Sequence, residues 1–183
     1  MNPRSSPVSI VLAAGAFAAH KHRDQRRKGA EASPYINHPI AVANVLANEA
    51  GISDPKILAA ALLHDTIEDT DTTAQELELE FGREIAAIVA EVTDDKSLPK
   101  QERKRLQIEH ANTLSAQAKL VKLADKICNV RDMSGSPPVD WSPQRKAEYF
   151  TWAKHVVDRI RGVSPVLETL FDEALARPNP IPT

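Results

Sequence analysis

The side chains best suited to chemistry are four ionisable groups within six positions: His64, Asp65, Glu68 and Asp69. They follow an apolar run, residues 57–63, that has the character of a buried helix. If the helix continues, residues four apart share a face, so His64 lies over Glu68. Ionisable groups beside a buried approach are costly to desolvate without a cation or charged partners. The segment therefore predicts a metal or acid–base site, although a His-Asp pair alone is common by chance.

Two further residues are candidates to complete a metal site. His38 lies in the segment 34–39, at the entrance of a predicted helix, where a side chain is well fixed. Asp125 lies inside an otherwise apolar helical run, with Asn129 one turn further along the same face. Each has a simpler alternative, since His38 can cap a helix or fill a core, and Asp125 can pair with Lys122 or another lysine. Together, two imidazoles and two carboxylates suit Mn²⁺, Fe²⁺ or Zn²⁺.

Two stretches are rich in positive charge. The first, residues 23–28, contains Arg23, Arg26, Arg27 and Lys28 and precedes His38, so it can bring cations near the metal candidates. Its simpler interpretation is a solubilising turn. The second, residues 100–110, alternates acidic and basic residues, and we interpret it as a helix with a solvated face rather than a binding patch.

Helical periodicity dominates the chain, and we find no segment with the period-two alternation of a strand. The sequence therefore predicts a single all-α domain over residues 1–183, with a proline-rich tail at 177–183. Polar loops are expected at 24–33, 93–99 and 134–142. The predicted helices cover residues 8–19, 39–50, 55–63, 72–81, 83–92, 100–110, 116–133, 143–161 and 165–176.

Composition restricts the class of protein. The formal net charge of −2 gives no global attraction to a nucleic acid polymer or an anionic membrane. Cys128 is the only cysteine, which excludes an intrachain disulfide and a cysteine-rich zinc site. The apolar stretch 8–19 is shorter than the roughly 18 residues that a membrane span needs. These features predict a cytoplasmic protein, and they leave its oligomeric state open.

The pattern of His38, His64-Asp65 and Asp125 is the ligand pattern of the HD phosphohydrolase superfamily. More specifically, the flanking sequence resembles the hydrolase domain of RelA/SpoT proteins over about residues 8–160. It is most similar to the single-domain animal and bacterial members of that family. The resemblance is carried by residues 26–28, 34–39, 61–70, 91–96, 103–107, 121–126 and 148–153.

The resemblance implies a helical HD-domain bundle that hydrolyses the 3′-pyrophosphate of the stringent-response alarmones guanosine tetra- and pentaphosphate, giving GDP or GTP and pyrophosphate. It implies a manganese ion, with Fe²⁺ or Zn²⁺ as alternatives, held by His38, His64, Asp65 and Asp125. The ion would acidify a bound water and polarise a phosphoryl oxygen. Glu68 and Asp69 are the implied catalytic carboxylates. The implied substrate contacts are Arg27, Lys28, Tyr35, Asn129, Arg145 and Tyr149.

Three other functions are alternatives for the same chain. A phosphatase acting on the 2′-phosphate of NADPH, or on another nucleotide, would use the same residue types, because both substrates present a phosphorylated ribose. A non-enzymatic nucleotide sensor would be favoured by loss of a ligand or catalytic position, and none is missing. A structural adaptor leaves the buried approach to His64 and the polar face of Asp125 and Asn129 unexplained.

Overall fold

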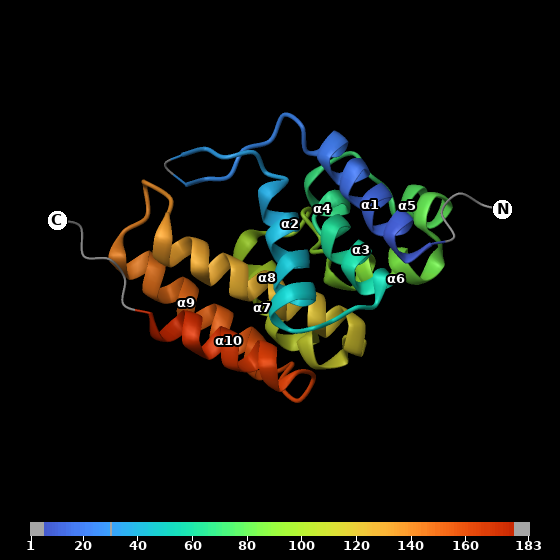
Figure 1. The fold of residues 1–183 in the computed structure, drawn as a ribbon. Helices are drawn as coiled ribbons and strands as arrows, with labels where there is room; N and C mark the ends of the chain where they lie inside the picture. The colour runs from blue at the N-terminus through green and yellow to red at the C-terminus, as the bar shows by residue number, and fades with distance from the viewer. Residues whose placement is uncertain (1–5, 30, 178–183) are drawn as a thin grey trace.

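The computed structural model describes residues 6–29 and 31–177, so the tail expected at 177–183 lies outside them after its first residue. Among the described residues there is no strand, only two isolated bridges between Arg26 and Pro34 and between Gly29 and Pro138. The prediction of an all-α protein is therefore confirmed (Figure 1). The helices are α1 (Pro7–Lys21), α2 (Asn37–Asn44), α3 (Pro55–Leu63), α4 (Thr66–Asp69), α5 (Ala74–Phe81), α6 (Arg83–Val92), α7 (Lys100–His110), α8 (Ala116–Gly135), α9 (Pro143–Asp158) and α10 (Pro165–Ala176), with a π-turn η1 (Val45–Glu49) and a 3₁₀ turn η2 (Ala111–Thr113).

Four helices begin with the same pair of residues, a capping side chain followed by proline. The side-chain oxygen accepts a hydrogen bond from a main-chain N–H of the first turn, and proline lacks the N–H that would otherwise be unsatisfied there. Asp54, for example, accepts from the N–H of Lys56 at 2.8 Å. The caps are Ser6, Asp54, Ser142 and Ser164.

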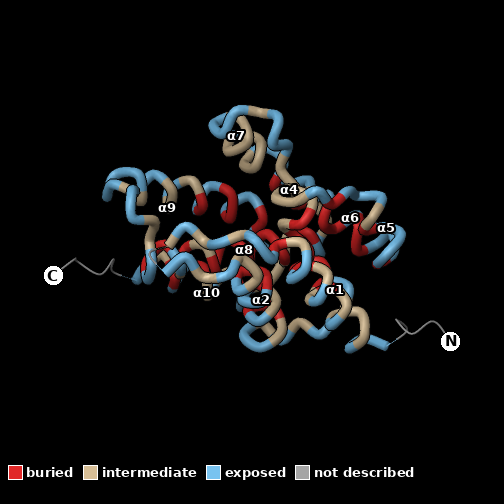
Figure 2. Tube along the Cα trace, turned by 90° about the horizontal axis from the view of Figure 1, so that it is seen from above, coloured by how far each residue is buried: buried red, intermediate tan, exposed pale blue. Residues whose placement is uncertain are grey.

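Helix α3 lies at the centre of the molecule, packed against α1, α2, α6 and α8. Six of its nine residues are buried, and three of these are alanines, whose small side chains allow neighbouring helices to approach closely. In Figure 2 much of the buried part of the chain lies around α8 and along α6, two of the helices that pack against α3. The apolar run 57–63 therefore carries the chain into the interior, and His64 follows directly after it.

Helix α8 is the second central element, and it packs against α10, α9 and α2 as well as α3. Twelve of its twenty residues are buried, and Lys122, Asp125 and Lys126 are among them. Because α8 crosses beside the C-terminal end of α3, it brings Asp125 next to His64. Among the described residues, no helix has the length and apolar composition needed to cross a membrane.

Several helix boundaries differ from the predicted ones. The second predicted helix extends past Asn44 as the π-turn η1, and α8 continues to Gly135 instead of ending at Met133. Helix α9 ends at Asp158, and the predicted end at residue 161 lies in a turn closed by Gly162, whose φ is +91°. A positive φ of this size favours glycine because it has no Cβ.

Helix α5 offers a matched pair of leucines for testing the core. Leu77 is fully buried, whereas Leu79 on the same helix is 80% exposed. We expect Leu77→Ala to lower the free energy of unfolding by about 3 kcal/mol, because it loses apolar contacts and leaves a cavity. Leu79→Ala should change it by less than about 0.5 kcal/mol. Urea unfolding followed by circular dichroism measures both, and equal effects would contradict this packing.

Candidate active site

His38, His64, Asp65 and Asp125 come together where α2, α3 and α8 meet. One ligand atom from each of the first three lies within 4.8 Å of the others. Asp125 Oδ1 lies 3.1 Å from Nε2 of His38 and 3.8 Å from Nε2 of His64. Thus residues from distant parts of the chain place two imidazoles and two carboxylates around one point.

The hydrogen bonds of His64 leave one ring nitrogen available to a cation. Its Nδ1 bonds to the main-chain oxygen of Ala61 at 2.8 Å, which requires the proton to be on Nδ1 in the neutral ring. Within the described part of the chain, the buried Nε2 has no well-aligned hydrogen bond, although Asp65 Oδ2 is 3.1 Å away. A buried nitrogen with a free lone pair beside carboxylates fits a metal ligand, and a main-chain carbonyl on the other nitrogen orients such rings. The donor set therefore fits a divalent metal ion.

The ionisable groups of the cluster shift one another's pKa values. Burial alone would raise the pKa of Asp125, but Lys126 and the two histidines hold it well below its usual range. The pKa of Asp65 is also lowered, because His64 and His38 outweigh the effect of burial. With no cation bound, burial opposes the charged form of His64, but Asp65 and Asp125 raise its pKa to about 9.

Metal binding is therefore expected to displace a proton from His64. Below its pKa of about 9 this ring is protonated in the stripped protein, and only the neutral ring binds metal. We expect metal affinity to rise with pH up to about 9, with about one proton released per ion near pH 7. Titration calorimetry in buffers of different ionisation enthalpy counts these protons. A pH-independent affinity without proton release would contradict the expectation.

Glu68 lies beside the cluster at the end of the short helix α4. The turn formed by His64 and Asp65 separates α3 from α4, so the continuous helix considered from the sequence is interrupted there. Glu68 Oε2 accepts a hydrogen bond from the main-chain N–H of Asp94 at 3.2 Å, and Arg103 Nη1 lies 3.5 Å from Oε1. Burial, together with the nearby charge of Asp94, raises the pKa of Glu68 to about 7. A carboxyl group with this pKa can exchange protons at neutral pH.

Asp69 is held by Tyr35 and Lys96. The hydroxyl of Tyr35 lies 3.0 Å from Asp69 Oδ2 and 2.7 Å from Asp65 Oδ2, and Lys96 pairs with Asp69 Oδ1. Tyr35, which the sequence predicts as a substrate contact, lines the pocket, and its hydroxyl hydrogen-bonds to these carboxylates. His22, which sequence analysis missed, is 1% exposed and stacks on the Tyr35 ring with centroids 4.9 Å apart.

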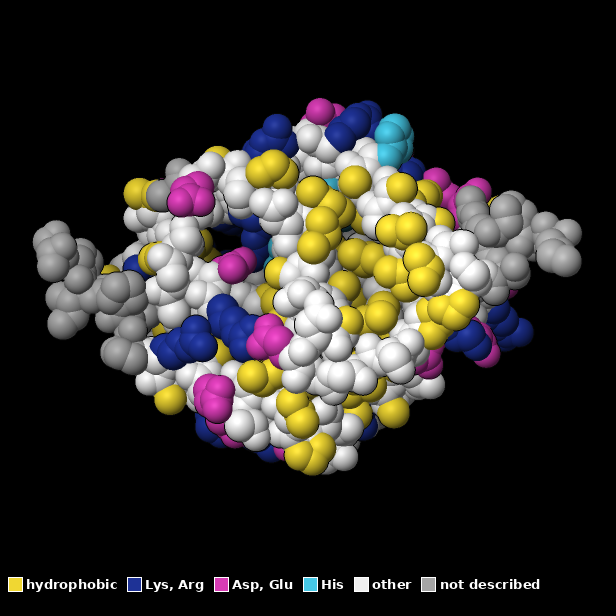
Figure 3. All heavy atoms as spheres, viewed as in Figure 1, with side chains coloured by type: hydrophobic (Ala, Val, Ile, Leu, Met, Phe, Trp, Pro, Cys, Tyr) yellow, Lys and Arg dark blue, Asp and Glu magenta, His cyan; other side chains and the backbone are white. Residues whose placement is uncertain are grey.

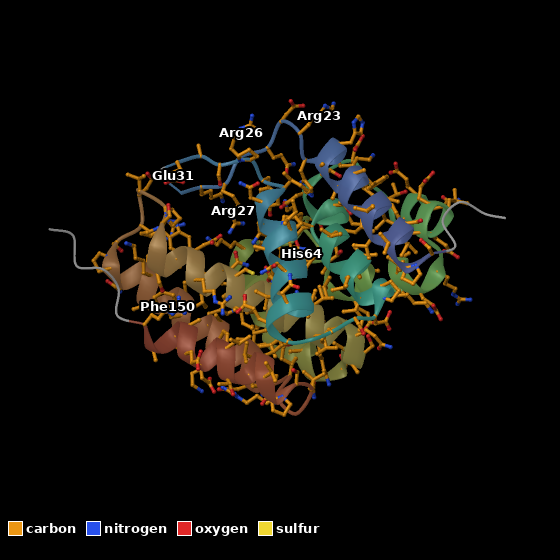
Figure 4. The ribbon with its side chains drawn as sticks, viewed as in Figure 1. Arg23, Arg26, Arg27, Glu31, His64 and Phe150 are labelled. Carbon is orange, nitrogen blue, oxygen red and sulfur yellow. The ribbon has the colours of Figure 1, made fainter. Side chains whose placement is uncertain are left out.

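The cluster opens into a pocket of about 430 Å³, which a neighbouring hollow under the loop 25–33 extends. In the space-filling view the molecule is hollowed left of centre, with Lys, Arg and His side chains inside (Figure 3). Arg27 points from the loop toward the helices, while Arg23 and Arg26 point outward (Figure 4). The nitrogen Nη2 of Arg27 bonds to Asn129 at 3.1 Å and to Asp132 at 2.7 Å.

The loop that carries Arg27 and Lys28 is attached to the segment after α8. Gly29 forms a bridge with Pro138. A Cβ at Gly29 would lie 2.8 Å from Oγ and 3.1 Å from the main-chain oxygen of Ser136. A side chain at position 29 would crowd Ser136, so glycine allows the loop to approach this segment closely, and the contact helps to position Arg27 and Lys28.

The interpretation of residues 100–110 as a solvated helix was wrong for one face. Four side chains at positions 100, 103, 104 and 107 share a face of α7 and line the pocket. The opposite side remains exposed, where Arg105 pairs with Glu102 and Glu109. A polar face toward a water-filled pocket has the same pattern as one toward solvent, so hydrophobic periodicity could not distinguish them. The four residues are Lys100, Arg103, Lys104 and Gln107.

Cations and aromatic rings form the outer wall of the pocket. Lys100, Trp141 and Tyr149 line it, with the Lys100 ammonium and the Tyr149 ring each 5.7 Å from the ring centre of Trp141. Arg145, a predicted substrate contact, does not itself line the pocket, but its guanidinium lies over Trp141, 4.3 Å from the ring centre. Burial and then repulsion from Arg145 lower the pKa of Lys100, because positive charges gather here. Sequence analysis missed Lys100, Lys104 and Trp141, which lie on a charged helix and at the end of a loop.

The chain resembles known proteins over most of its length. Residues 14–150 match a family model described as HD domain. The guanosine-3′,5′-bis(diphosphate) 3′-pyrophosphohydrolase MESH1 of Xenopus tropicalis is 56% identical over 92% of this chain and 94% of its own. The human MESH1 is 57% identical over 89% of this chain and 91% of its own. A solved structure described as a metazoan orthologue of SpoT that hydrolyses ppGpp superposes with a TM-score of 0.88 at 50% identity, covering 90% of this chain and 93% of that one.

Proposed function

Because this chain belongs to the HD-domain family, we propose that it is a metal-dependent hydrolase that removes pyrophosphate from the 3′ position of guanosine tetra- and pentaphosphate. The single observation that supports this most is the position of the His38, His64, Asp65 and Asp125 cluster. It lies at the bottom of a cation-lined pocket, beside Glu68 and Asp69. Manganese in the site and a location in the cytoplasm are parts of the same proposal.

The four cluster residues would hold the metal. A divalent cation bound there would lower the pKa of a coordinated water and polarise a phosphoryl oxygen. In the overall reaction, water gives an OH group to the 3′ phosphorus, the bond to the ribose 3′ oxygen breaks, and that oxygen takes a proton. The residues of this chain must therefore accept one proton and donate another.

Glu68 and Asp69 are the groups placed to move these protons. Glu68, with a pKa of about 7, is partly ionised at neutral pH and can act in either direction. Asp69 is held toward the site by the Tyr35 hydroxyl and the Lys96 ammonium. We assign proton transfer to the two residues together, because neighbouring carboxylates titrate as a coupled set.

The pocket walls supply the groups that a polyphosphorylated nucleoside requires. Ammonium and guanidinium groups bind phosphate oxygens, and a planar base stacks on aromatic rings and on Arg. The expected contacts are Arg27, Lys28, Tyr35, Asn129, Arg145 and Tyr149. Lys100, Lys104 and Trp141 are proposed as further contacts, because they line the same pocket. A small nucleotide carrying several phosphates therefore suits this pocket.

The experiment that tests the proposal compares two substrates. Manganese-loaded protein is incubated separately with guanosine tetraphosphate and with NADPH, and the products are separated by anion-exchange chromatography. We expect GDP and pyrophosphate in equal amounts from the first substrate. Release of orthophosphate from NADPH with no pyrophosphate from guanosine tetraphosphate would favour the 2′-phosphatase instead.

A further inference from the structure

Two residues that the proposed function leaves without a role contact Glu68. Asp94 lies in the segment 91–96, and Arg103 lies in the segment 103–107 of α7. The main-chain N–H of Asp94 donates to Glu68 Oε2 at 3.2 Å, and Arg103 Nη1 approaches Glu68 Oε1 at 3.5 Å. Each carboxylate oxygen of Glu68 therefore has a donor from one of the two segments.

Gln107 connects the segments to each other. Its Nε2 donates a hydrogen bond to the side chain of Asp94, across the short loop between α6 and α7. The other amide atom, Oε1, is buried and has no hydrogen-bond partner among the residues that the structure describes. A buried amide costs free energy when it is half satisfied, so packing alone is a weak reason to have glutamine there. The hydrogen bond to the Asp94 side chain is what glutamine provides here that an apolar side chain of the same size would not.

Polar contacts contribute to the position of helix α7, together with the partly buried Ile108 that packs against the core. None of its residues is buried, and it packs mainly against α9 and the adjoining turn η2. Figure 2 shows it standing apart from the other helices. On the face toward the pocket, Lys100 and Lys104 alternate with Arg103 and Gln107. The same face therefore contacts both the phosphate-binding wall and the network that holds Glu68.

We propose that Gln107 and Asp94 are positioning residues of the reaction, in which Gln107 fixes Asp94 and the main-chain N–H of Asp94 fixes the carboxylate of Glu68. This inference rests on the proposed function, since Glu68 is assigned there to proton transfer. Positioning matters because a displacement of about 1 Å at a reacting group can lower the rate by about 100-fold. Neither Gln107 nor Asp94 has to touch the substrate.

The first test uses Gln107→Met, which keeps the side-chain size and removes the donor. We expect kcat on guanosine tetraphosphate to fall about tenfold, with KM and bound metal unchanged. The matched control is Gln101→Met on the exposed side of the same helix, which should leave kcat unchanged. Wild-type kcat in Gln107→Met, or a raised KM with unchanged kcat, would overturn the inference.

A double-mutant cycle separates positioning from general loss of structure. If Gln107 acts through Glu68, adding Gln107→Met to Glu68→Gln should change the remaining rate by less than about twofold. A further tenfold loss in the double variant would show that Gln107 acts elsewhere, which would also overturn the proposal.

The inference can also be tested without measuring catalysis. This test is needed if the wild type releases no pyrophosphate, because that result would contradict the proposed function but not the positioning of Glu68. The carboxyl carbon of Glu68, labelled with ¹³C, is titrated by NMR in zinc-loaded protein. Asp94→Asn should lower the midpoint, because the charge of Asp94 favours the protonated form of Glu68, and Gln107→Met should also move it. The same midpoint in wild type and both variants would overturn the inference. The charged groups that face Glu68 are Asp65, Asp69, Asp94, Arg103 and Lys122.

Discussion

Glu68→Gln is expected to lower kcat about 1,000-fold while bound metal stays at the wild-type level. The amide keeps the size of the side chain but cannot accept or donate the transferred proton, and general acid–base catalysis contributes about 10²- to 10⁴-fold. The side-chain oxygens of Glu68 bond to Asp94 and Arg103, so we do not expect the substitution to release the ion from His38, His64, Asp65 and Asp125. Steady-state kinetics and metal analysis by mass spectrometry measure the two quantities on one preparation.

The control for this variant is Glu78→Gln, an exposed glutamate on α5 that should keep full activity. Two outcomes would contradict the division of the site into metal ligands and proton-transfer residues. If Glu68→Gln emptied the site of metal, Glu68 would itself belong to the ligand set. If it kept full activity, Asp69 alone would account for the chemistry.

Asp125→Asn should have the opposite pattern, with metal and activity lost together. The amide is a poor ligand for a divalent cation, and it leaves the buried ammonium of Lys126, 3.1 Å from Asp125 Oδ2, without its partner. An uncompensated buried charge costs about 3 to 5 kcal/mol, so we also expect a lower melting temperature. Metal analysis after gel filtration should find less than about a tenth of the wild-type content.

Asp132→Asn on the same helix is the matched control for metal content. Asp132 is half exposed and pairs with Arg27 on the substrate side of the pocket, away from the cluster. Its variant should keep the ion. Full metal occupancy in Asp125→Asn would show that three residues, His38, His64 and Asp65, are sufficient to hold it.

The sequence predicted the parts of the site that lie next to buried apolar runs. His64 and Asp65 follow the apolar residues of α3, and Asp125 interrupts an apolar stretch of α8. Ionisable residues beside apolar runs of this kind can be recognised in the sequence alone. Helical periodicity also predicted most of the helices and the absence of strands among the described residues. These features are local, and a single pattern is enough to detect them.

The parts that the sequence did not predict depend on tertiary contacts. The inward face of α7 has the same polar pattern as a solvated helix, so only the fold shows that Lys100 and Gln107 line a pocket. The alternative pairing of Asp125 with a nearby lysine is confirmed for Lys126, whereas Lys122 bonds to the main-chain oxygen of Val92. Two lysines one turn apart on the same helix cannot be distinguished without the position of α6.

The measurement that tests the central claim most directly is pyrophosphate release from guanosine tetraphosphate by protein that has been stripped with a chelator and then reloaded with manganese. The account predicts no release above background from the stripped protein, recovery on reloading, and no recovery in manganese-loaded Glu68→Gln. Full release by protein shown to be free of metal would contradict the account. Complete inactivity of the loaded wild type would contradict it equally.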